Sequence, residues 1–177
     1  MEHSPVGPRL YTDFDGVFGA GYAGLLWLSS TTGDVIDAHG NRTQITWAPD
    51  LVTAIDELRA EYGVELVWVT SWCEDDDIGL RVVPVLHGIR GGRTLPHTVE
   101  DGSGEWKLRA ILADQAASPA PFIWADDVEV EAHGKGLLGT GSHLLLSPNT
   151  SMGLGPWHVA RMREWLAANA AGAECRA

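Results

Sequence analysis

The chain has 177 residues, of which 45% are hydrophobic and 20% are charged, a composition that excludes a disordered or fibrous protein. Its 24 acidic residues against 12 basic ones give a formal net charge of -12, which excludes an extended basic interface with nucleic acid. The longest apolar runs fall far short of the roughly 20 residues that a helix needs to cross a bilayer, so no membrane span is predicted.

The N-terminal residues and the cysteines predict a cytoplasmic location. The sequence begins MEHSPVGPRL, without the basic and apolar regions of a secretory signal. The chain has two cysteines, Cys73 and Cys175, and this small number favours a reducing compartment over a disulfide framework.

The first predicted element is a short strand over residues 8–12, which runs directly into the sequence DFDGV. Asp13 and Asp15 are two residues apart, so on an extended backbone both carboxylates would point to one side. Two like charges so close together repel each other unless a cation or a shared proton holds them. Gly16 then allows a sharp turn. Because this pattern costs stability, it indicates a chemical role.

The next segment, residues 17–48, does not follow the rhythm of alternating strands and helices. It is rich in glycine at first and then has the pattern of a β-hairpin, which turns near residues 39–41. We expect this hairpin, residues 33–47, to act as a flap at the opening of a site.

A helix is predicted over residues 51–63, where apolar residues recur at helical spacing. Asp50 is the expected N-cap and Gly63 the expected C-cap. Residues 64–70 then have the continuous apolar pattern of a buried strand.

The segment 74–104 is less regular. Its first residues predict a short helix, residues 88–93 predict a loop, and residues 81–86 and 93–99 predict short or edge strands. The later elements are a helix at 105–117, strands at 121–127 and 143–148, and a helix at 156–170. The low-complexity residues 171–177 are expected to form a mobile tail.

Strands that alternate with helices predict an α/β fold, with helices on both faces of a mostly parallel sheet. We therefore expect a single domain over residues 1–170, built as a three-layer Rossmann-like sheet. It would carry the small β-hairpin flap within residues 17–48 and no large cap domain. In such sheets ligands bind beyond the carboxyl ends of the strands.

Polar residues gather at those strand ends. They are Asp13, Phe14 and Asp15, then Thr70 and Ser71, then Asp126 and Asp127, with Lys107 near the start of a helix. Clustered carboxylates bind a hard, oxygen-seeking cation, and Mg²⁺ is the expected one. The cation and the lysine would neutralise phosphate charge, and a hydroxyl and backbone N–H groups would hold its other oxygens. One carboxylate could then attack phosphorus, so the pattern predicts phosphoryl transfer.

The chain resembles the haloacid dehalogenase-like hydrolase superfamily through four motifs in order: DFDGV, VWVTSW, Lys107 and IWADD. This resemblance spans the whole domain. It implies a phosphatase with Asp13 as the nucleophile that forms an aspartyl-phosphate and Asp15 as the general acid and base. It also implies phosphate contacts from Thr70 and Lys107.

The resemblance implies a magnesium site as well, with Asp13, the Asp15 carbonyl and Asp126 as ligands and Asp127 acting through a water or behind them. Further substrate contacts are expected from four residues near these motifs: Phe14, Gly16, Ser71 and Trp72. Two alternatives remain open. Ser71 could hold phosphate instead of Thr70, and Glu129 or Glu131 could replace Asp127.

A closer resemblance is carried by DFDGVF, TSW, WADD and GLGPWHVARMREWL. It is to small haloacid dehalogenase-like domains of predicted RNA-repair proteins, which also occur as free-standing actinobacterial and phage proteins. This resemblance favours a nucleotide or a nucleic-acid terminal phosphate as substrate, whereas the acidic charge favours a small phosphorylated metabolite. Without a large cap the site would be open, so a second subunit could close it.

Two other classes of function compete with a phosphatase. A non-catalytic module could keep the fold and use the carboxylates only to hold a metal ion or ligand. Because Asp13 and Asp15 are both present, loss of the catalytic residues is not evident. A receiver-type signalling domain also clusters Asp, Thr or Ser, and Lys, but there the lysine comes last, whereas Lys107 precedes Asp126.

Overall fold

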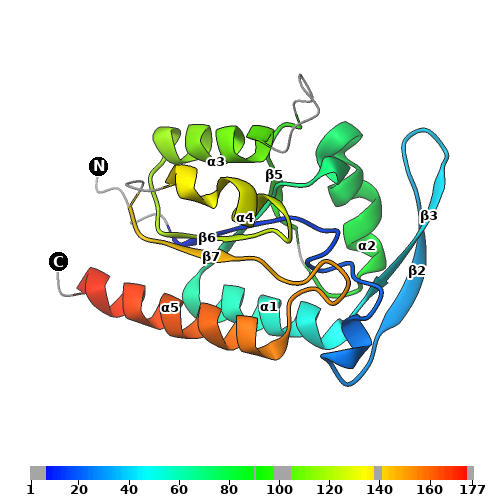
Figure 1. Cartoon of the computed structure of the whole chain (residues 1–177), viewed down its shortest axis with the longest axis horizontal. Coiled ribbons are helices and arrows are strands. Elements are labelled where there is room, and N and C mark those ends of the chain that lie inside the picture. The colour runs from blue at the N-terminus through cyan, green and yellow to red at the C-terminus, as the bar shows by residue number, and fades with distance from the viewer. Residues whose placement is uncertain (1–6, 90, 98–104, 138–140, 175–177) are drawn as a thin grey trace.

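A computed structural model describes residues 7–89, 91–97, 105–137 and 141–174, which form a three-layer α/β fold (Figure 1). The central sheet has the strand order β5-β4-β1-β6-β7, and every neighbouring pair is parallel. Its strands are Arg9–Thr12 (β1), Glu65–Trp68 (β4), Arg93–Thr94 (β5), Phe122–Ala125 (β6) and His143–Leu146 (β7). The predicted Rossmann-like fold class is therefore confirmed.

Helices cover both faces of this sheet. Figure 1 shows α1 (Pro49–Tyr62) and α5 (Pro156–Glu174) below the sheet, and α3 (Glu105–Ala117) and α4 (Glu129–His133) above it. Successive side chains of a strand point to opposite faces, so each strand contributes to two cores. Leu10 of β1 packs in the core between the sheet and helices α1 and α5, and its neighbour Tyr11 packs in the core between the sheet and α3.

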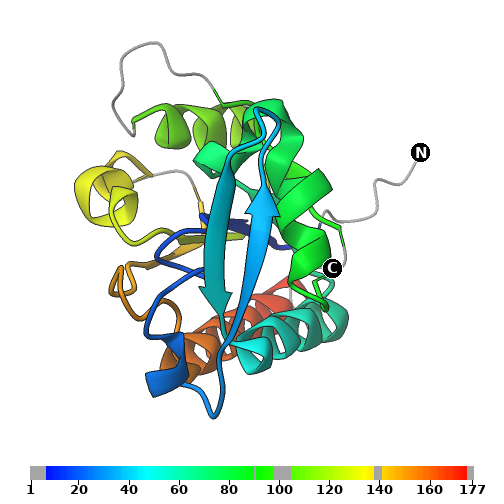
Figure 2. The same ribbon diagram turned by 90° about the vertical axis from the view of Figure 1, so that its right-hand side faces the viewer.

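A β-hairpin stands apart from the sheet. Its strands are β2 (Thr31–Ile36) and β3 (Arg42–Trp47), which pair antiparallel. The turn passes through Gly40, whose φ of 85° is in the left-handed region that glycine adopts without strain. The hairpin stands in front of one end of the sheet and beside α2 (Val83–Val85) (Figure 2). The small hairpin predicted from the sequence is therefore present, and the described residues contain no large cap domain.

The predicted N-cap of α1 was wrong. The N-cap is Ala48, with an extended backbone and no capping side chain, and Pro49 is the first helical residue. Proline suits that position because its fixed φ matches the helix and the missing N–H would have no partner there. The C-cap is Gly63 as predicted, with a φ of 65°.

The predicted strand at residues 81–86 was also wrong, because this segment is helical. A π-helical turn over Ile78–Val82 runs into α2. Ile78, Val82 and Leu86 are buried, and their spacing of four places them on one helical face. Of the predicted strand at 93–99, only Arg93–Thr94 is a strand, and residues 98–99 lie outside the described residues.

The remaining short elements are 3-10 turns over Ala23–Leu25, Ser71–Asp76 and Gly134–Leu137. Helix α5 continues to Glu174, so it takes in the first residues of the predicted mobile tail, and residues 175–177 lie outside the described part. Within the described residues, the search for a helix both long and apolar enough to span a membrane found none.

Candidate active site

The strand order reverses between β1 and β6, and this point is where α/β sheets bind ligands. Asp13 follows β1 and Asp126 follows β6. The pairing of the sheet continues one residue beyond the strands, because Asp13 donates its N–H to the Ala125 carbonyl (3.0 Å) and Asp126 donates to Leu146 (3.1 Å). The backbone of both aspartates is therefore fixed at the carboxyl edge of the sheet.

Three carboxylates meet at this edge. Asp13, Asp126 and Asp127 each offer an oxygen atom, and these oxygens all lie within 4.8 Å of one another. Asp126 is fully buried, and only 8% of Asp13 is exposed. Buried like charges at such distances repel strongly, so the group needs a cation or a shared proton.

Lys107 supplies part of that compensation from the first turn of α3. Its ammonium forms an ion pair with Asp13 Oδ2 and a second one, 2.7 Å long, with Asp126 Oδ2. The lysine side chain is buried with the two carboxylates. One ammonium against three carboxylates leaves a formal charge of -2 when all three are ionised.

The other oxygens of these carboxylates accept backbone hydrogen bonds. Asp126 Oδ1 accepts from the N–H groups of Val128 (3.0 Å) and Glu129 (2.7 Å), so it is tied to the start of α4. Asp13 Oδ1 accepts from the N–H of Phe14 (2.6 Å). Both side chains are thus held in one orientation.

Gly16 explains how Asp127 approaches the group. A Cβ atom at residue 16 would lie 2.3 Å from Asp127 Oδ2, and the φ of Gly16 is 68°. Any other residue would both strain the backbone and displace the Asp127 carboxylate. Gly16 is therefore a structural requirement of the carboxylate group, a role that the expected substrate contact did not include.

Burial changes the protonation of the group. It raises the pKa of Asp13 to about 6, although the Lys107 ammonium opposes that rise and the neighbouring Asp126 adds to it. For Lys107, burial lowers the pKa, but the two carboxylates outweigh burial and raise the pKa above its usual value. At neutral pH the lysine is therefore charged and Asp13 is mainly ionised.

Of the two candidate hydroxyls, the structure brings that of Thr70 to the carboxylates. Thr70 is fully buried, its side chain hydrogen-bonds Asp13 and thereby favours the ionised carboxylate, and its Oγ1 accepts from the N–H of Trp72 (3.4 Å). Ser71 is exposed and lines a cavity together with Trp72, and it is not one of the groups that contact the carboxylates.

The Asp15 carboxylate lies outside the group of three. Its Oδ2 accepts a hydrogen bond from the indole N–H of Trp72 (2.9 Å), and the residue is exposed. Desolvation by the surrounding protein nevertheless raises the pKa of Asp15, and the nearby Asp127 charge adds to the rise, whereas the hydrogen bond from Trp72 opposes it. The backbone turns after Asp13 instead of staying extended, so the two carboxylates do not share one side. Metal ligation through the Asp15 carbonyl stays a prediction.

Three other candidate residues do not bring their side chains to the site. The Phe14 ring is fully buried in the core, so only its backbone N–H is near the site. Glu129 and Glu131 are not in the carboxylate group, and Glu129 Oε2 lies 3.3 Å from His133 Nε2 within α4. Among the described acidic residues, Asp127 is the one that joins Asp13 and Asp126.

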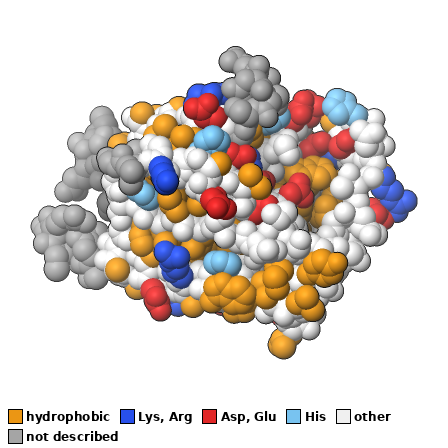
Figure 3. Space-filling view, viewed as in Figure 1, with side chains coloured by type: hydrophobic (Ala, Val, Ile, Leu, Met, Phe, Trp, Pro, Cys, Tyr) orange, Lys and Arg blue, Asp and Glu red, His pale blue; other side chains and the backbone are white. Residues whose placement is uncertain are grey.

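The hairpin borders this site on two sides. One cavity, of about 170 Å³, is lined by Asp15, by residues 19–21 and by residues 43–46 of β3. Another, of about 300 Å³, lies between Trp72 and the hairpin turn, where the N–H of Ala38 donates to Asp77 Oδ2 (3.2 Å). Acidic side chains gather between the hairpin and the body of the molecule (Figure 3).

No pattern in the sequence indicates these hairpin contacts. Asp77 is buried and ties the turn to the body, but in the sequence it is the last of a run of acidic residues. Acidic residues in such a run normally face solvent. The contact becomes visible only in the folded chain, where the Ala38 N–H reaches Asp77 Oδ2. Thr43 lines both cavities, and a threonine in a strand carries no signal of that position.

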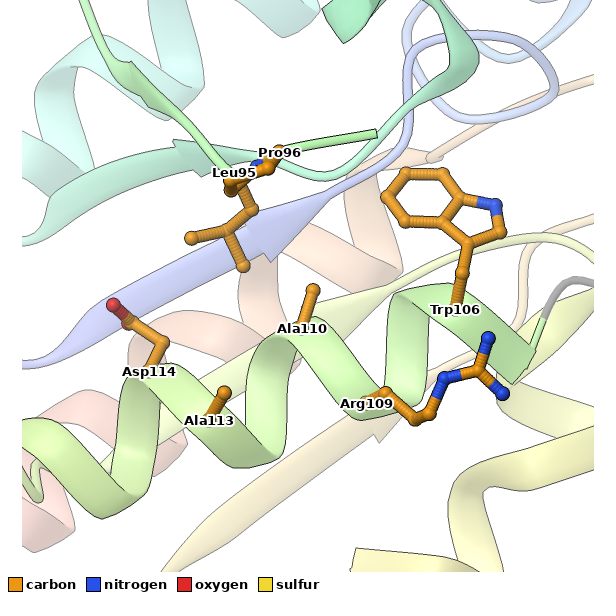
Figure 4. Close-up of a pocket in the computed structure, with 7 residues that line it drawn as sticks. All are labelled: Leu95, Pro96, Trp106, Arg109, Ala110, Ala113 and Asp114. Carbon is orange, nitrogen blue, oxygen red and sulfur yellow. The ribbon is translucent and has the colours of Figure 1, made fainter. Parts of the chain in front are cut away.

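One cavity beside α3 does not belong to this site. It measures about 380 Å³ and is lined mainly by apolar atoms: Leu95, Pro96, Trp106, Arg109, Ala110, Ala113 and Asp114 (Figure 4). None of the residues predicted to be functional lines it. The candidate active site is therefore the carboxylate group at the β1–β6 edge.

Comparisons of the chain with protein-family models, with curated proteins and with solved structures found no match.

Proposed function

We propose that this protein is a Mg²⁺-dependent phosphomonoester phosphatase of the haloacid dehalogenase-like type, acting through Asp13. The observation that carries the proposal is the ion pair of Lys107 with Asp13 and Asp126, at the edge where the strand order reverses. An attacking carboxylate, a fixed cation and a hydroxyl from Thr70 lie together there. These are the groups that transfer of a dianionic phosphoryl group requires.

The donor set fits Mg²⁺. Three carboxylates offer oxygens within 4.8 Å of one another, and oxygen ligands are the ones this hard cation prefers. The residual formal charge of -2 beside Lys107 matches a divalent ion. Asp13, Asp126 and Asp127 would hold it, with Gly16 leaving space for Asp127. When bound, Mg²⁺ would neutralise charge on the phosphate oxygens.

In the first step, an Asp13 carboxylate oxygen attacks phosphorus and the bond from phosphorus to the ester oxygen breaks. Lys107 and the Thr70 hydroxyl stabilise the charge on the phosphoryl oxygens. Asp15 in its protonated form gives its proton to the departing alkoxide oxygen. The products of this step are the free alcohol and an aspartyl-phosphate at Asp13.

In the second step, water attacks the phosphorus of the aspartyl-phosphate. Asp15, now a carboxylate, takes a proton from that water, and the bond between phosphorus and the Asp13 oxygen breaks. Inorganic phosphate leaves, and both aspartates return to their starting states.

The surroundings favour a substrate that presents one terminal phosphate. Candidates are a nucleotide, a nucleic-acid end or a small phosphometabolite. The net charge of -12 and the acidic side chains near the hairpin disfavour a long polyanion lying across the surface. The two cavities beside Asp15 and Trp72 give room for the alcohol part of a small ester.

The experiment is phosphate release from p-nitrophenyl phosphate, nucleotides, sugar phosphates and oligonucleotides with 3′- or 5′-terminal phosphates. Wild type and Asp13→Asn are compared with Mg²⁺ and with EDTA. We expect wild type to turn over substrate in Mg²⁺ but not in EDTA, and Asp13→Asn to show no turnover in either. Turnover that survives in Asp13→Asn would contradict the proposal.

One observation favours a second candidate, a module that binds a metal ion or ligand without catalysis. Both oxygens of Asp13 already have partners within the protein, one in Lys107 and the other in the Phe14 N–H, as a carboxylate that only holds ligands would. Saturable Mg²⁺ binding by wild type without turnover of any substrate would support this module.

A further inference from the structure

The hydrogen bond between Trp72 and Asp15 joins two residues that are far apart in the sequence. Trp72 Nε1 donates to Asp15 Oδ2 over 2.9 Å. We propose that Trp72 is a positioning residue that holds the Asp15 carboxylate outside the metal-binding group, where it can exchange a proton with the substrate. This inference rests on the proposed function, because it concerns the proton-transfer step of the same reaction.

Asp15 needs such a restraint because of where it lies. It is two residues from Asp13, in a turn whose next residue, Gly16, packs against the Asp127 carboxylate. The side chain is exposed, so without a partner it would sample several rotamers. A carboxylate that turned toward a bound cation would become another ligand and could not carry a proton. The hydrogen bond from the Trp72 indole opposes such a rotation.

The indole is itself held by residues of the site. The Trp72 backbone N–H donates to Thr70 Oγ1 (3.4 Å). The ring packs edge-on against the fully buried ring of Phe14, with centroids 6.3 Å apart and planes at 84°. Phe14 precedes Asp15 in the chain, so the position of the indole is fixed relative to the backbone that carries the carboxylate.

Substrates with different leaving groups distinguish a role of Trp72 in proton transfer from a purely structural role. A poor leaving group, such as an alkoxide, needs a proton from Asp15, whereas p-nitrophenolate leaves without one. In Trp72→Phe the edge-on ring contact stays and the N–H is lost. We expect kcat/KM, which reports the first step and does not depend on hydrolysis of the aspartyl-phosphate, to fall on the order of tenfold for an alkyl phosphate and by less than about threefold for p-nitrophenyl phosphate. KM for the alkyl phosphate should stay within about twofold.

Two further variants sharpen this test. In an Asp15→Asn background, Trp72→Phe should cause no additional loss, because no proton transfer remains for Trp72 to support. Trp157→Phe is the matched control, since Trp157 is 57% exposed on α5, and both kinetic parameters should stay at wild-type values. An equal loss of kcat/KM for both substrates in Trp72→Phe, or an additive loss with Asp15→Asn, would overturn the inference.

A measurement without substrate separates this inference from the proposed function. In ¹H–¹⁵N spectra, Trp72→Phe identifies the indole resonance of Trp72, and Asp15→Ala should shift that resonance toward the exposed indole of Trp157. An unshifted resonance would overturn the inference even in an active phosphatase. A shifted resonance in a protein with no turnover would instead count against the proposed function and leave the contact established.

Discussion

The proposed reaction needs Asp13 as a charged carboxylate, but its buried position in the fold disfavours that charge. Only 8% of the residue is exposed to solvent. Burial raises its pKa from 3.8 to about 6, and Lys107 offsets only part of that cost. A carboxylate placed this way is destabilising in the absence of a cation and becomes favourable when one is bound.

This cost predicts that Asp13→Asn stabilises the protein in EDTA. Above pH 6 the folded state holds a charged carboxylate that it disfavours, and below about pH 4 Asp13 is protonated in both states. The stabilisation should therefore be on the order of 2 kcal/mol at pH 8 and should disappear as the pH falls toward 4. Lys107 keeps Asp126 as its partner in the variant.

Thermal unfolding at pH 8 and pH 4, with EDTA and with Mg²⁺, measures this effect. Mg²⁺ should raise the Tm of wild type and do so much less for Asp13→Asn. A lower Tm of Asp13→Asn at pH 8 in EDTA would show that the ion pair with Lys107 outweighs the cost of burial.

At the scale of single elements, α1 shows which backbone positions depend on glycine. Its C-cap, Gly63, has a φ of 65° and donates its N–H to the Arg59 carbonyl. No atom lies within 4 Å of a Cβ built there, so a substitution would meet strain and no clash.

We expect Gly63→Ala to lower the free energy of unfolding by about 1 kcal/mol, or roughly 2–4 °C in Tm. Activity should not change, because Gly63 precedes β4 at the edge of the sheet opposite the candidate site. Gly21→Ala is the control for stability, since Gly21 also has open space but lacks a positive φ. Equal losses in the two variants would rule out left-handed strain as the cause.

The elements predicted best from the sequence were those with a clear period or a strong boundary. The helix at residues 105–117 was predicted with its observed bounds, and the helix that ends at Gly63 was predicted with its C-cap. The segment at residues 81–86 was not, because a run of valines around a proline has the composition of a strand. Only the burial of Ile78, Val82 and Leu86 on one face shows that it is helical.

The site was predictable in part for a similar reason. The order of strand ends placed Asp13, Asp126 and Lys107 together, because parallel strands end at one edge. The direction of Asp15 was not predictable, since it depends on a turn after β1 and on a tryptophan 57 residues away. The requirement for Gly16 likewise depends on how closely Asp127 approaches in three dimensions.

For the whole molecule, net charge is the property that bears on substrate choice. The chain carries -12 at neutral pH, and acidic side chains gather near the hairpin beside the candidate site. A phosphate ester that approaches this face meets a repulsive field, which salt screens over about 10 Å at 0.1 M.

We therefore expect kcat/KM to rise severalfold as salt increases from about 20 to about 200 mM at constant Mg²⁺. The rise should be steeper for a phosphorylated oligonucleotide than for a small ester, because the oligonucleotide carries more charge. Stopped-flow or initial-rate measurements over this range provide the slopes. A fall in kcat/KM with salt would indicate attraction by a basic surface and contradict this account.

The central claim is that Asp13 forms a covalent bond to phosphorus, and a burst experiment with Asp15→Asn tests it most directly. Since p-nitrophenolate leaves without a proton, the first step should proceed, whereas hydrolysis of the aspartyl-phosphate should stall without Asp15 as base. In the presence of Mg²⁺ we predict a burst of p-nitrophenolate equal to the concentration of the Asp15→Asn enzyme. The double variant that also carries Asp13→Asn should show no burst. Steady release without a burst, from a variant whose wild type is active, would contradict the account.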